Sequence, residues 1–526
     1  MTGPDDSFHV YDTTLRDGAQ REGISYSVND KLAVARLLDD YGVGFIEGGW
    51  PGAMPKDTEF FARAASELQL QHAQLVAFGA TRRAGATAAS DPQVAALLES
   101  GAPVVTIVAK SDVRHVTQAL RTTLDENLAM VTDTVAHLVA AGRRVFVDHE
   151  HFFDGYLHDP DYGVRLLVAA ADAGAAVGVL CDTNGGMLPS RVLAIASDVA
   201  SRTGVRLGIH CQDDTACAVA NTLAAVEAGA THVQCTANGY GERTGNADLF
   251  AVVANLETKL GMTVLPAGKL RETVRVSHAI AEIANLTPDT HQAYAGTSSF
   301  AHKAGLHASA LKVSAELYNH IDPALVGNDM RVLITEMAGR ASVELKGREL
   351  GFDLSGDPDL LGRVVDRVKE LEARGWTFEA ADASFELLLR EESAGRHRLF
   401  TVESWRTIVE QRPDGEVVSE ATVKVLADGD RIVATGEGNG PVNALDNALR
   451  TAVVQLCPEV DKLELVDYKV RILAGVTGTG AVTRVLVGTT DGDAEWTTVG
   501  VHENVIAASW TALEDALAYG LLRSGR

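Results

Sequence analysis

The sequence predicts an α/β protein built on a (β/α)8 barrel, and three observations support this prediction. Short apolar segments alternate with helical segments through the first half of the chain. Eight such segments occur, each a nearly continuous apolar run, which is typical of strands buried on both faces of a parallel sheet. Charged or amide residues directly follow several of them, at the strand end where α/β folds keep their chemistry. A doubly wound open sheet is the alternative, but it rarely needs eight regular units.

The elements of the barrel follow in order along residues 1–265. The predicted strands are His9 to Thr14, Phe45 to Trp50, Leu75 to Ala80, Val104 to Ala109, Val145 to His149, Ala176 to Cys181, Arg206 to Cys211 and His232 to Thr236. The predicted helices between them are Asn29 to Tyr41, Lys56 to Leu68, Pro92 to Ser100, Leu124 to Ala141, Tyr162 to Ala173, Ser190 to Thr203 and Ala216 to Ala228. We expect Asn29 to cap the first helix and Gly42 to help end it.

The pattern changes twice beyond the barrel, so the 526 residues predict three domains. Residues 266–383 predict helices and loops that end with a helix from Leu360 to Arg374. Within them the segment Ala293 to Ser309 is rich in Gly, Ser and His, which favours a lid or a second wall of a site.

Residues 384–526 predict two successive units of strands followed by a helix, starting with a strand at Ser384 to Ser393. The two helices are expected at Asn443 to Leu456 and Ile506 to Leu522. Such a repeat predicts a duplicated α+β domain, which we expect to sense a ligand and to form a homodimer.

Composition limits the partners. The formal net charge of −25 argues against nucleic acid or an anionic membrane surface as the main partner, although a local basic pocket could still bind an anionic substrate. The five cysteines show no C-x-x-C spacing and predict free thiols in a reducing, cytoplasmic compartment. We see no apolar run of membrane-spanning length.

The segment HVYDTTLRDGAQRE holds the pair Arg16 and Asp17 at the end of the first strand. A cation beside a carboxylate at this place could hold a metal ion and stabilise an oxyanion. A plain surface ion pair is the commoner explanation of such a pair. The choice between them depends on what the other strands deliver to the same end of the barrel.

The other strands deliver further polar side chains. In chain order, the residues at the strand ends are Arg16 and Asp17; Glu47; Asp148, His149 and Glu150; Asp182, Thr183 and Asn184; His210, Gln212 and Asp213; and Asn238, Glu242 and Arg243. Carboxylate, imidazole and amide ligands from the first, seventh and eighth strands would form an oxygen-rich site for Mg²⁺ or Mn²⁺, with Zn²⁺ as the alternative. His210 and Gln212 are alternate residues of one strand, so both can face one ion.

Two parts of this set have alternative interpretations. Asp213 and Asp214 directly precede a helix, where an N-cap role is as reasonable as metal ligation. The glycine-rich loop from Asn238 to Asn246 could cradle a phosphate or merely make a turn.

Several long motifs resemble one enzyme family. They are TTLRDGAQREG, FIEGGWPG, HEHFFDGY, LCDTNGG, NGYGERTGNADL and FAHKAGLHASA. Together they are similar to the metal-dependent barrel enzymes that carry out Claisen condensations of acyl-CoA, which include the isopropylmalate and homocitrate synthases. The likeness covers nearly the whole chain, and GNGPVNALDNAL and EWTTVGVHENVIAASW are similar to the branch that uses pyruvate.

The resemblance implies a role for each matched residue. Asp17 and His210 would be metal ligands, with Asn238 on or near the metal. Arg16 would stabilise the keto or enolate oxygen, Thr183 would hold the 2-oxo acid carboxylate, and Glu47 and His302 would line the substrate pocket. Glu150 would assist His307 in removing a proton from acetyl-CoA. One residue departs from the family pattern, which has His-x-His on the seventh strand, because this chain has Gln212 there. Glutamine can ligate through its carbonyl oxygen, but it is a neutral and weaker donor.

The implied activity is the condensation of acetyl-CoA with a small 2-oxo acid, pyruvate being the expected one, to give a 2-hydroxy-2-methyl dicarboxylate and CoA. The implied effector is isoleucine, bound by the C-terminal domain. Two alternatives remain open. One is the same chemistry with another 2-oxo acid, as in isopropylmalate or homocitrate synthesis, or the reverse cleavage by a lyase. The other is a non-catalytic amino-acid sensor whose barrel has lost its metal through Gln212.

Overall fold

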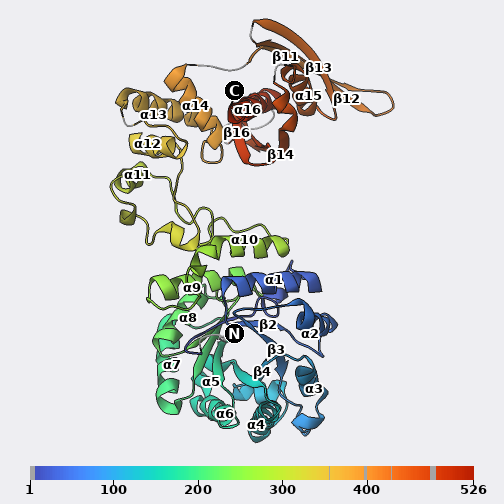
Figure 1. Ribbon diagram of the computed structural model, residues 1–526, viewed down its shortest axis with the longest axis vertical. Coiled ribbons are helices and arrows are strands. Elements are labelled where there is room, and N and C mark those ends of the chain that lie inside the picture. Colours follow the sequence, from blue (N-terminus) through green and yellow to red (C-terminus); the bar gives the residue numbers. More distant parts are fainter. Residues whose placement is uncertain are drawn as a thin grey trace. The chain divides into compact units, whose positions relative to one another are not determined.

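The computed structural model describes residues 6–354, 356–395, 400–427, 429–455, 457–473 and 481–525. They form two compact units (Figure 1). The first comprises Met1–Phe300 and Ile321–Asp329, and the second comprises Ala301–His320 and Met330–Arg526. The division into three domains at residues 265 and 383 therefore stays a prediction.

The first unit is a closed barrel of eight parallel strands, which confirms the predicted fold. The strands are β1 (His9–Asp12), β2 (Phe45–Gly49), β3 (Gln74–Ala80), β4 (Val104–Lys110), β5 (Arg144–Glu150), β6 (Val177–Asp182), β7 (Leu207–Cys211) and β8 (His232–Cys235). They pair in chain order, and β1 closes the barrel by pairing with β8 through Tyr11 and Gln234. All the carboxyl ends of the strands therefore lie at one mouth.

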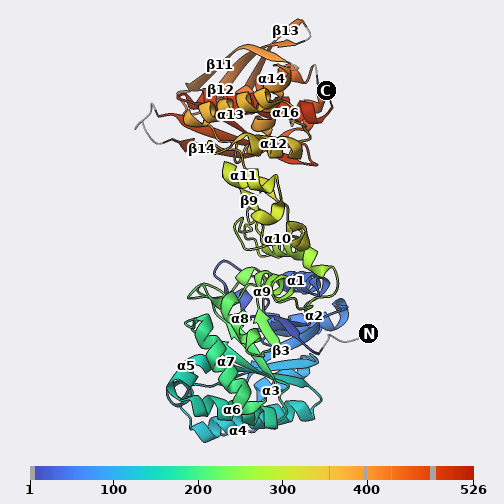
Figure 2. The same ribbon diagram turned by 90° about the vertical axis from the view of Figure 1, so that its left-hand side faces the viewer.

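Helices cover the outside of the barrel (Figures 1 and 2). They are α1 (Val28–Tyr41), α2 (Pro55–Glu67), α3 (Pro92–Glu99), α4 (Leu124–Ala140), α5 (Phe152–His158), α6 (Pro160–Asp172), α7 (Pro189–Thr203), α8 (Ala218–Glu227), α9 (Leu249–Thr258) and α10 (Thr273–Ile283). The predicted cap Asn29 is wrong, because the α1 cap is Ser27, which exchanges side-chain to backbone bonds with Asp30 in a capping box. Gly42 ends α1 with φ +99°, where a Cβ would lie 2.3 Å from Pro266.

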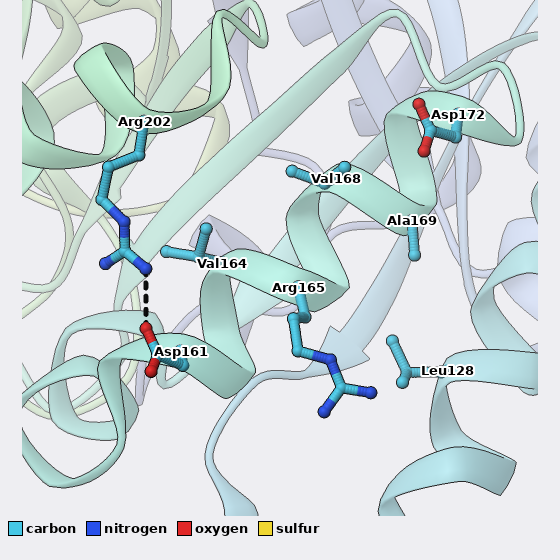
Figure 3. Close-up of a pocket in the computed structure, with 8 residues that line it drawn as sticks. All are labelled: Leu128, Asp161, Val164, Arg165, Val168, Ala169, Asp172 and Arg202. Atoms are coloured by element: carbon cyan, nitrogen blue, oxygen red, sulfur yellow. Dashed lines mark hydrogen bonds and ion pairs between the residues drawn. The ribbon is translucent and has the colours of Figure 1, made fainter.

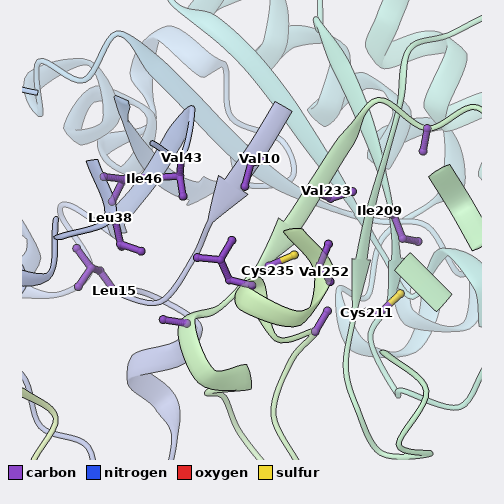
Figure 4. Close-up of a cluster of buried hydrophobic side chains, with 14 of the residues drawn as sticks. Val10, Leu15, Leu38, Val43, Ile46, Ile209, Cys211, Val233, Cys235 and Val252 are labelled. Atoms are coloured by element: carbon purple, nitrogen blue, oxygen red, sulfur yellow. The ribbon is translucent and has the colours of Figure 1, made fainter. Parts of the chain in front are cut away.

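Two apolar clusters show which strand residues point outward and which point into the barrel. Val10, Ile209, Cys211, Val233 and Cys235 pack outward against the helices (Figure 4). Their neighbours along each strand face the barrel interior, because successive strand residues point to opposite sides. Interior positions hold a second cluster that includes Tyr11, Phe45 and Phe146. The same alternation directs Gln234 and His210 into the barrel.

The second unit contains a short parallel pair and two antiparallel sheets. The pair is β9 (Ala301–His302) and β10 (Arg331–Val332), and the helices that follow in this part are α11 (Gly305–Leu311), α12 (Arg340–Glu349), α13 (Pro358–Ala373) and α14 (Asp382–Ala394). One sheet is β11 (Thr401–Gln411), β12 (Val417–Ala427) and β13 (Asp430–Gly438), followed by α15 (Pro441–Val453). The other is β14 (Glu464–Ile472), β15 (Thr483–Thr490) and β16 (Glu495–His502), followed by α16 (Val505–Arg523). The predicted duplication of a sheet followed by a helix is thus confirmed.

Two predictions in this unit are wrong. Ser384 to Ser393, predicted as a strand, lies in helix α14, where Phe385, Leu388 and Leu389 recur at helical spacing and are buried. Helix α16 is long and apolar enough to cross a membrane, although we saw no such run in the sequence. Its residues Ala512, Leu517 and Leu521 are buried in the cores of this unit, which is typical of an ordinary core helix.

Candidate active site

Arg16 is held in place by a buried carboxylate. Its Nε donates to Glu47 Oε1 at 2.6 Å, and its guanidinium lies 3.9 Å from the centre of the Phe78 ring. Glu47 is fully buried and also accepts hydrogen bonds from Thr13 and Tyr11. Arg16 and Asp17 are therefore not a plain surface ion pair, because their side chains are only 16% and 7% exposed. Glu47 thus holds Arg16, and a contact of Glu47 with substrate stays a prediction.

Asp17 lies beside the two polar residues at the end of β7. Its Oδ2 is 3.4 Å from His210 Nε2 and 3.4 Å from Gln212 Nε2. Gln212 Nε2 also lies 3.2 Å from His210 Nε2 and donates to Asn246 Oδ1 at 3.0 Å. All four residues are buried. We call Asp17, His210, Gln212 and Asn246 the ligand cluster.

Asn246, which we did not predict, takes the place that we expected for Asn238. The side chain of Asn238 instead bonds to Tyr240, Ser277 and Gln292, with its Oδ1 accepting from Ser277 Oγ at 2.6 Å. The structure therefore does not bring Asn238 into the ligand cluster.

The glycine-rich loop turns so that Asn246 reaches β7. Gly245 has φ +95°, and a Cβ there would lie 1.9 Å from the carbonyl oxygen of Gly239. Asn246 and Gln212 form an isolated bridge, and Asn246 Nδ2 donates to the carbonyl of Tyr240 at 2.9 Å. The loop thus packs against itself and fixes Asn246, which supports the turn interpretation over a phosphate cradle.

The ligand cluster fits a hard divalent cation. In the described part of the chain no three His, Cys, Asp or Glu residues come together as a metal site. The cluster instead offers one carboxylate, one imidazole and two amide groups. Gln212 Nε2 faces the cluster, while its Oε1 is buried and has no hydrogen-bond partner among the described residues. Turning the amide end for end would bring this unsatisfied oxygen to a cation. Burial lowers the pKa of His210, which favours the neutral imidazole that metal ligation requires.

Two further predicted residues lie at the same mouth of the barrel. Glu150, the last residue of β5, forms an ion pair with Lys110 from the end of β4. Thr183 follows β6, and its Oγ1 accepts a hydrogen bond from the backbone N–H of His151 at 2.8 Å. Because that contact uses a lone pair, the hydroxyl proton of Thr183 remains to be donated to a ligand.

Asp213 supports the first turn of α8. Its Oδ1 accepts from the backbone N–H of Ala218 at 2.8 Å, while Asp214 pairs with Arg243 at 2.7 Å. The N-cap of α8 is Cys217, so neither aspartate is the N-cap, although Asp213 satisfies the N–H of the first helical residue. Neither aspartate joins the ligand cluster.

His302 and His307 belong to the second unit. His302 Nε2 lies 2.8 Å from Asn319 Oδ1. The ring of His307 stacks on Tyr318, with centroids 4.0 Å apart and planes at 27°. His307 is thus held by an aromatic neighbour that we did not single out in the sequence.

A groove on the outside of the barrel has no part in this site. It lies on helices α4, α6 and α7 and is lined by residues that include Leu128, Val164 and Arg165 (Figure 3). Arg202 and Asp161 form an ion pair of 2.7 Å there. These residues belong to the helical layer and not to the strand ends.

Asp148 should make stability depend on pH. Burial raises the pKa of its carboxyl to about 8, and the nearby Glu47 carboxylate adds to this effect. Between about pH 4 and pH 8 the folded state then holds a proton that the unfolded state has lost, so the free energy of unfolding falls as the pH rises. We expect Asp148→Asn to reduce this fall by about 1 kcal/mol or more near pH 8.

The measurement is denaturant unfolding of the wild type and Asp148→Asn from pH 6 to pH 9. Asp161→Asn, a substitution at an exposed aspartate, is the control. The Asp148→Asn curve should be flatter than the wild-type curve, and the control should follow the wild type. Parallel curves for all three proteins would show that Asp148 is ionised in the folded state.

Comparisons with known proteins agree with this architecture. The HMGL-like family matches residues 7–280, the homocitrate synthase post-HMGL domain-like family matches residues 295–375, and the LeuA allosteric (dimerisation) domain matches residues 379–521. The barrel, the helices after it and the C-terminal sheets thus each match one domain of a known kind.

Full-length relatives match the chain from end to end. An (R)-citramalate synthase of Streptomyces coelicolor is 70% identical over 99% of this chain and 98% of its own length. An (R)-citramalate synthase of Aquifex aeolicus is 45% identical over 98% of both chains. A 2-isopropylmalate synthase of Methanocaldococcus jannaschii is 29% identical over 97% of this chain and 94% of its own.

The barrel and the C-terminal sheets define an HMGL-like scaffold joined to a LeuA-type allosteric domain. Within that class, the chain belongs to the (R)-citramalate synthase family.

Proposed function

We propose that the protein is an acyltransferase that condenses acetyl-CoA with pyruvate to give (R)-citramalate and free CoA. The observation that carries this proposal is the full-length identity of 70% to an (R)-citramalate synthase. The buried cluster at the barrel mouth supports it, because Asp17, His210 and Arg16 lie together there. The pathway we infer for the product is isoleucine biosynthesis.

The ligand cluster would hold Mg²⁺ or Mn²⁺, with Zn²⁺ as the less suitable ion because it prefers nitrogen and sulfur ligands. When bound, such an ion supplies Lewis acidity and a template for the 2-oxo acid. Asp17, His210 and Asn246 are the expected ligands, and Gln212 would turn its free carbonyl oxygen toward the ion. Asn246 replaces Asn238 in this assignment.

Arg16 provides a fixed positive charge at the reacting carbonyl. Glu47 and the ring of Phe78 hold the guanidinium of Arg16, whose side chain is 16% exposed and thus not completely closed off. As the carbon–carbon bond forms, the carbonyl oxygen of pyruvate gains negative charge, and a preorganised cation stabilises that charge. Thr183 would donate its hydroxyl proton to the pyruvate carboxylate.

Removal of a methyl proton from acetyl-CoA requires a base. We assign this step to His307 assisted by Glu150, with His302 in the substrate pocket. The stacking of His307 on Tyr318 supports a fixed ring. Attack of the resulting enolate on the pyruvate carbonyl gives a citramalyl thioester, and water then cleaves the thioester to citramalate and CoA.

The C-terminal domain would regulate the enzyme and join two copies of it. The match to a LeuA allosteric (dimerisation) domain supports both roles. Strand β14 lies at the edge of its sheet, and all nine of its residues are exposed. They include the apolar residues Val466, Val470 and Ile472, which a second copy could cover. We propose a homodimer with isoleucine as the effector, working in the cytoplasm, as the absence of C-x-x-C spacing among the cysteines favours.

Gln212→His should strengthen metal binding. A neutral imidazole is a better donor than an amide carbonyl, and it would complete the His-x-His pair of the family on β7. We expect Gln212→His to bind Mn²⁺ at least about tenfold more tightly than the wild type does. Changes in the groups around a metal ligand alter metal affinity by a similar factor. Isothermal titration of metal-stripped protein with Mn²⁺ measures this. Gln71→His, an exposed site, is the control, and unchanged affinity in Gln212→His would place the ion elsewhere.

The proposed reaction is tested by CoA-thiol release from acetyl-CoA with a panel of 2-oxo acids, with the product identified by chiral chromatography. We expect pyruvate to give (R)-citramalate at a rate well above that with 2-oxoisovalerate or 2-oxoglutarate. A preference for either of these acids would favour an isopropylmalate- or homocitrate-type synthase. No release with any acid would favour the non-catalytic sensor.

A further inference from the structure

Gln234 links a ligand of the proposed metal site to a buried acid. It lies on β8 and is 1% exposed, with its side chain inside the barrel. Its Oε1 lies 3.1 Å from His210 Nδ1, and its Nε2 donates to Asp148 Oδ1 at 2.8 Å. The amide thus bridges strand β7 and strand β5, and no step assigned above uses it.

The two ends of an amide have different hydrogen-bonding properties, and this fixes the proton on His210. In the structure, Asp148 Oδ1 accepts from the NH₂ end of Gln234, and the carbonyl end of Gln234 faces His210. A carbonyl oxygen can only accept, so Nδ1 of His210 must carry the ring proton. In a neutral ring the lone pair then lies on Nε2, the atom that faces Asp17 and Gln212.

We propose that Gln234 is a positioning residue that holds His210 in the Nδ1–H tautomer and so presents the Nε2 lone pair to a divalent cation. This inference rests on the proposed metal site. Asp148 contributes by orienting Gln234. The role resembles that of the groups that orient metal-ligating histidines in general, which fix the tautomer and the ring direction.

The first test is the tautomer of His210 in metal-free protein. Histidine is labelled with ¹⁵N, and the His210 signals are assigned by their loss in His210→Gln. We expect the proton on Nδ1 in the wild type and a mixture of both tautomers in Gln234→Leu. A wild-type ring protonated on Nε2 would overturn the inference. The NMR measurement requires neither bound metal nor enzymatic activity.

The second test is Mn²⁺ affinity, measured by isothermal titration. Gln234→Leu should weaken binding by about 10- to 100-fold, as expected for loss of a partner that orients a ligand. Gln234→Glu keeps an acceptor for Nδ1 and should bind Mn²⁺ nearly as the wild type does, which separates this role from simple packing. Gln71→Leu, at an exposed position, is the matched control.

Equal affinity of Gln234→Leu and the wild type would overturn the positioning role. If Gln234→Leu does not fold, the wild-type tautomer and the Gln234→Glu affinity still decide the matter. Failure of the wild type itself to bind Mn²⁺ would overturn the metal-presenting role together with the proposed metal site. Mn²⁺ binding without citramalate formation would contradict only the proposed reaction and leave the role of Gln234 intact.

Discussion

Asp17→Ala is expected to abolish citramalate formation while leaving the fold intact. Asp17 is the only carboxylate of the ligand cluster, so its loss removes the one anionic ligand of the proposed cation. Loss of an outer partner of a metal ligand costs roughly 10- to 100-fold, and loss of the carboxylate itself should exceed the upper end of that range.

The fold should survive because the contacts of Asp17 are long. Its carboxylate lies 3.6 Å from Arg16 and 3.4 Å from His210, so little folding energy depends on it. Thermal unfolding and CoA-thiol release are measured on the same samples. Asp161→Ala, whose parent side chain pairs with Arg202 on the outer groove, is the matched control and should keep full activity. Substantial turnover by Asp17→Ala would remove Asp17 from the chemistry.

Arg16→Met is expected to lower both activity and stability. Loss of one preorganised donor to a developing oxyanion typically costs ~10²–10³ in kcat. The substitution also leaves Glu47 fully buried without its counter-charge, and breaking a buried pair in this way costs about 3–5 kcal/mol. The two effects have different causes, so they can be separated.

The double variant Arg16→Met/Glu47→Gln separates them. A neutral glutamine removes the uncompensated charge, so the double variant should recover much of the lost free energy of unfolding. Activity should stay as low as in Arg16→Met, because the cation is still missing. Recovery of activity in the double variant would show that Arg16 acts only through stability.

The sequence was sufficient to predict the barrel because each strand is a continuous apolar run, and such runs form parallel strands buried on both faces. The same logic identified Arg16, Asp17, His210 and Gln212, since strand ends converge in a barrel whatever the details of packing. Thr183 and Glu150 also follow from their places at strand ends.

The prediction failed where tertiary contacts decide between similar residues. The loop from Asn238 to Asn246 offers two asparagines, and only the turn at Gly245 determines that the second one reaches Gln212. A usable signal was the glycine directly before Asn246, which favours a sharp turn there. Glu47 was predicted at the end of the second strand, but no sequence pattern shows that it binds Arg16.

The sequence prediction was also wrong at two local elements, the start of the first helix and the segment Ser384 to Ser393. The pattern Ser27-x-x-Asp30 is a capping-box signature, and it should have moved the start of the first helix away from Asn29. The segment Ser384 to Ser393 has a short apolar run that fits either a strand or a helix, and its burial against other helices of the unit decides for the helix.

The most direct measurement of the central claim is CoA release from acetyl-CoA and pyruvate by metal-stripped wild-type protein, before and after Mn²⁺ or Mg²⁺ is added back. We predict no release from the stripped protein and steady formation of (R)-citramalate once either ion is restored, which would show that Gln212 supports a working site. Equal release with and without metal, or none under any condition, would contradict the proposed role of the ligand cluster.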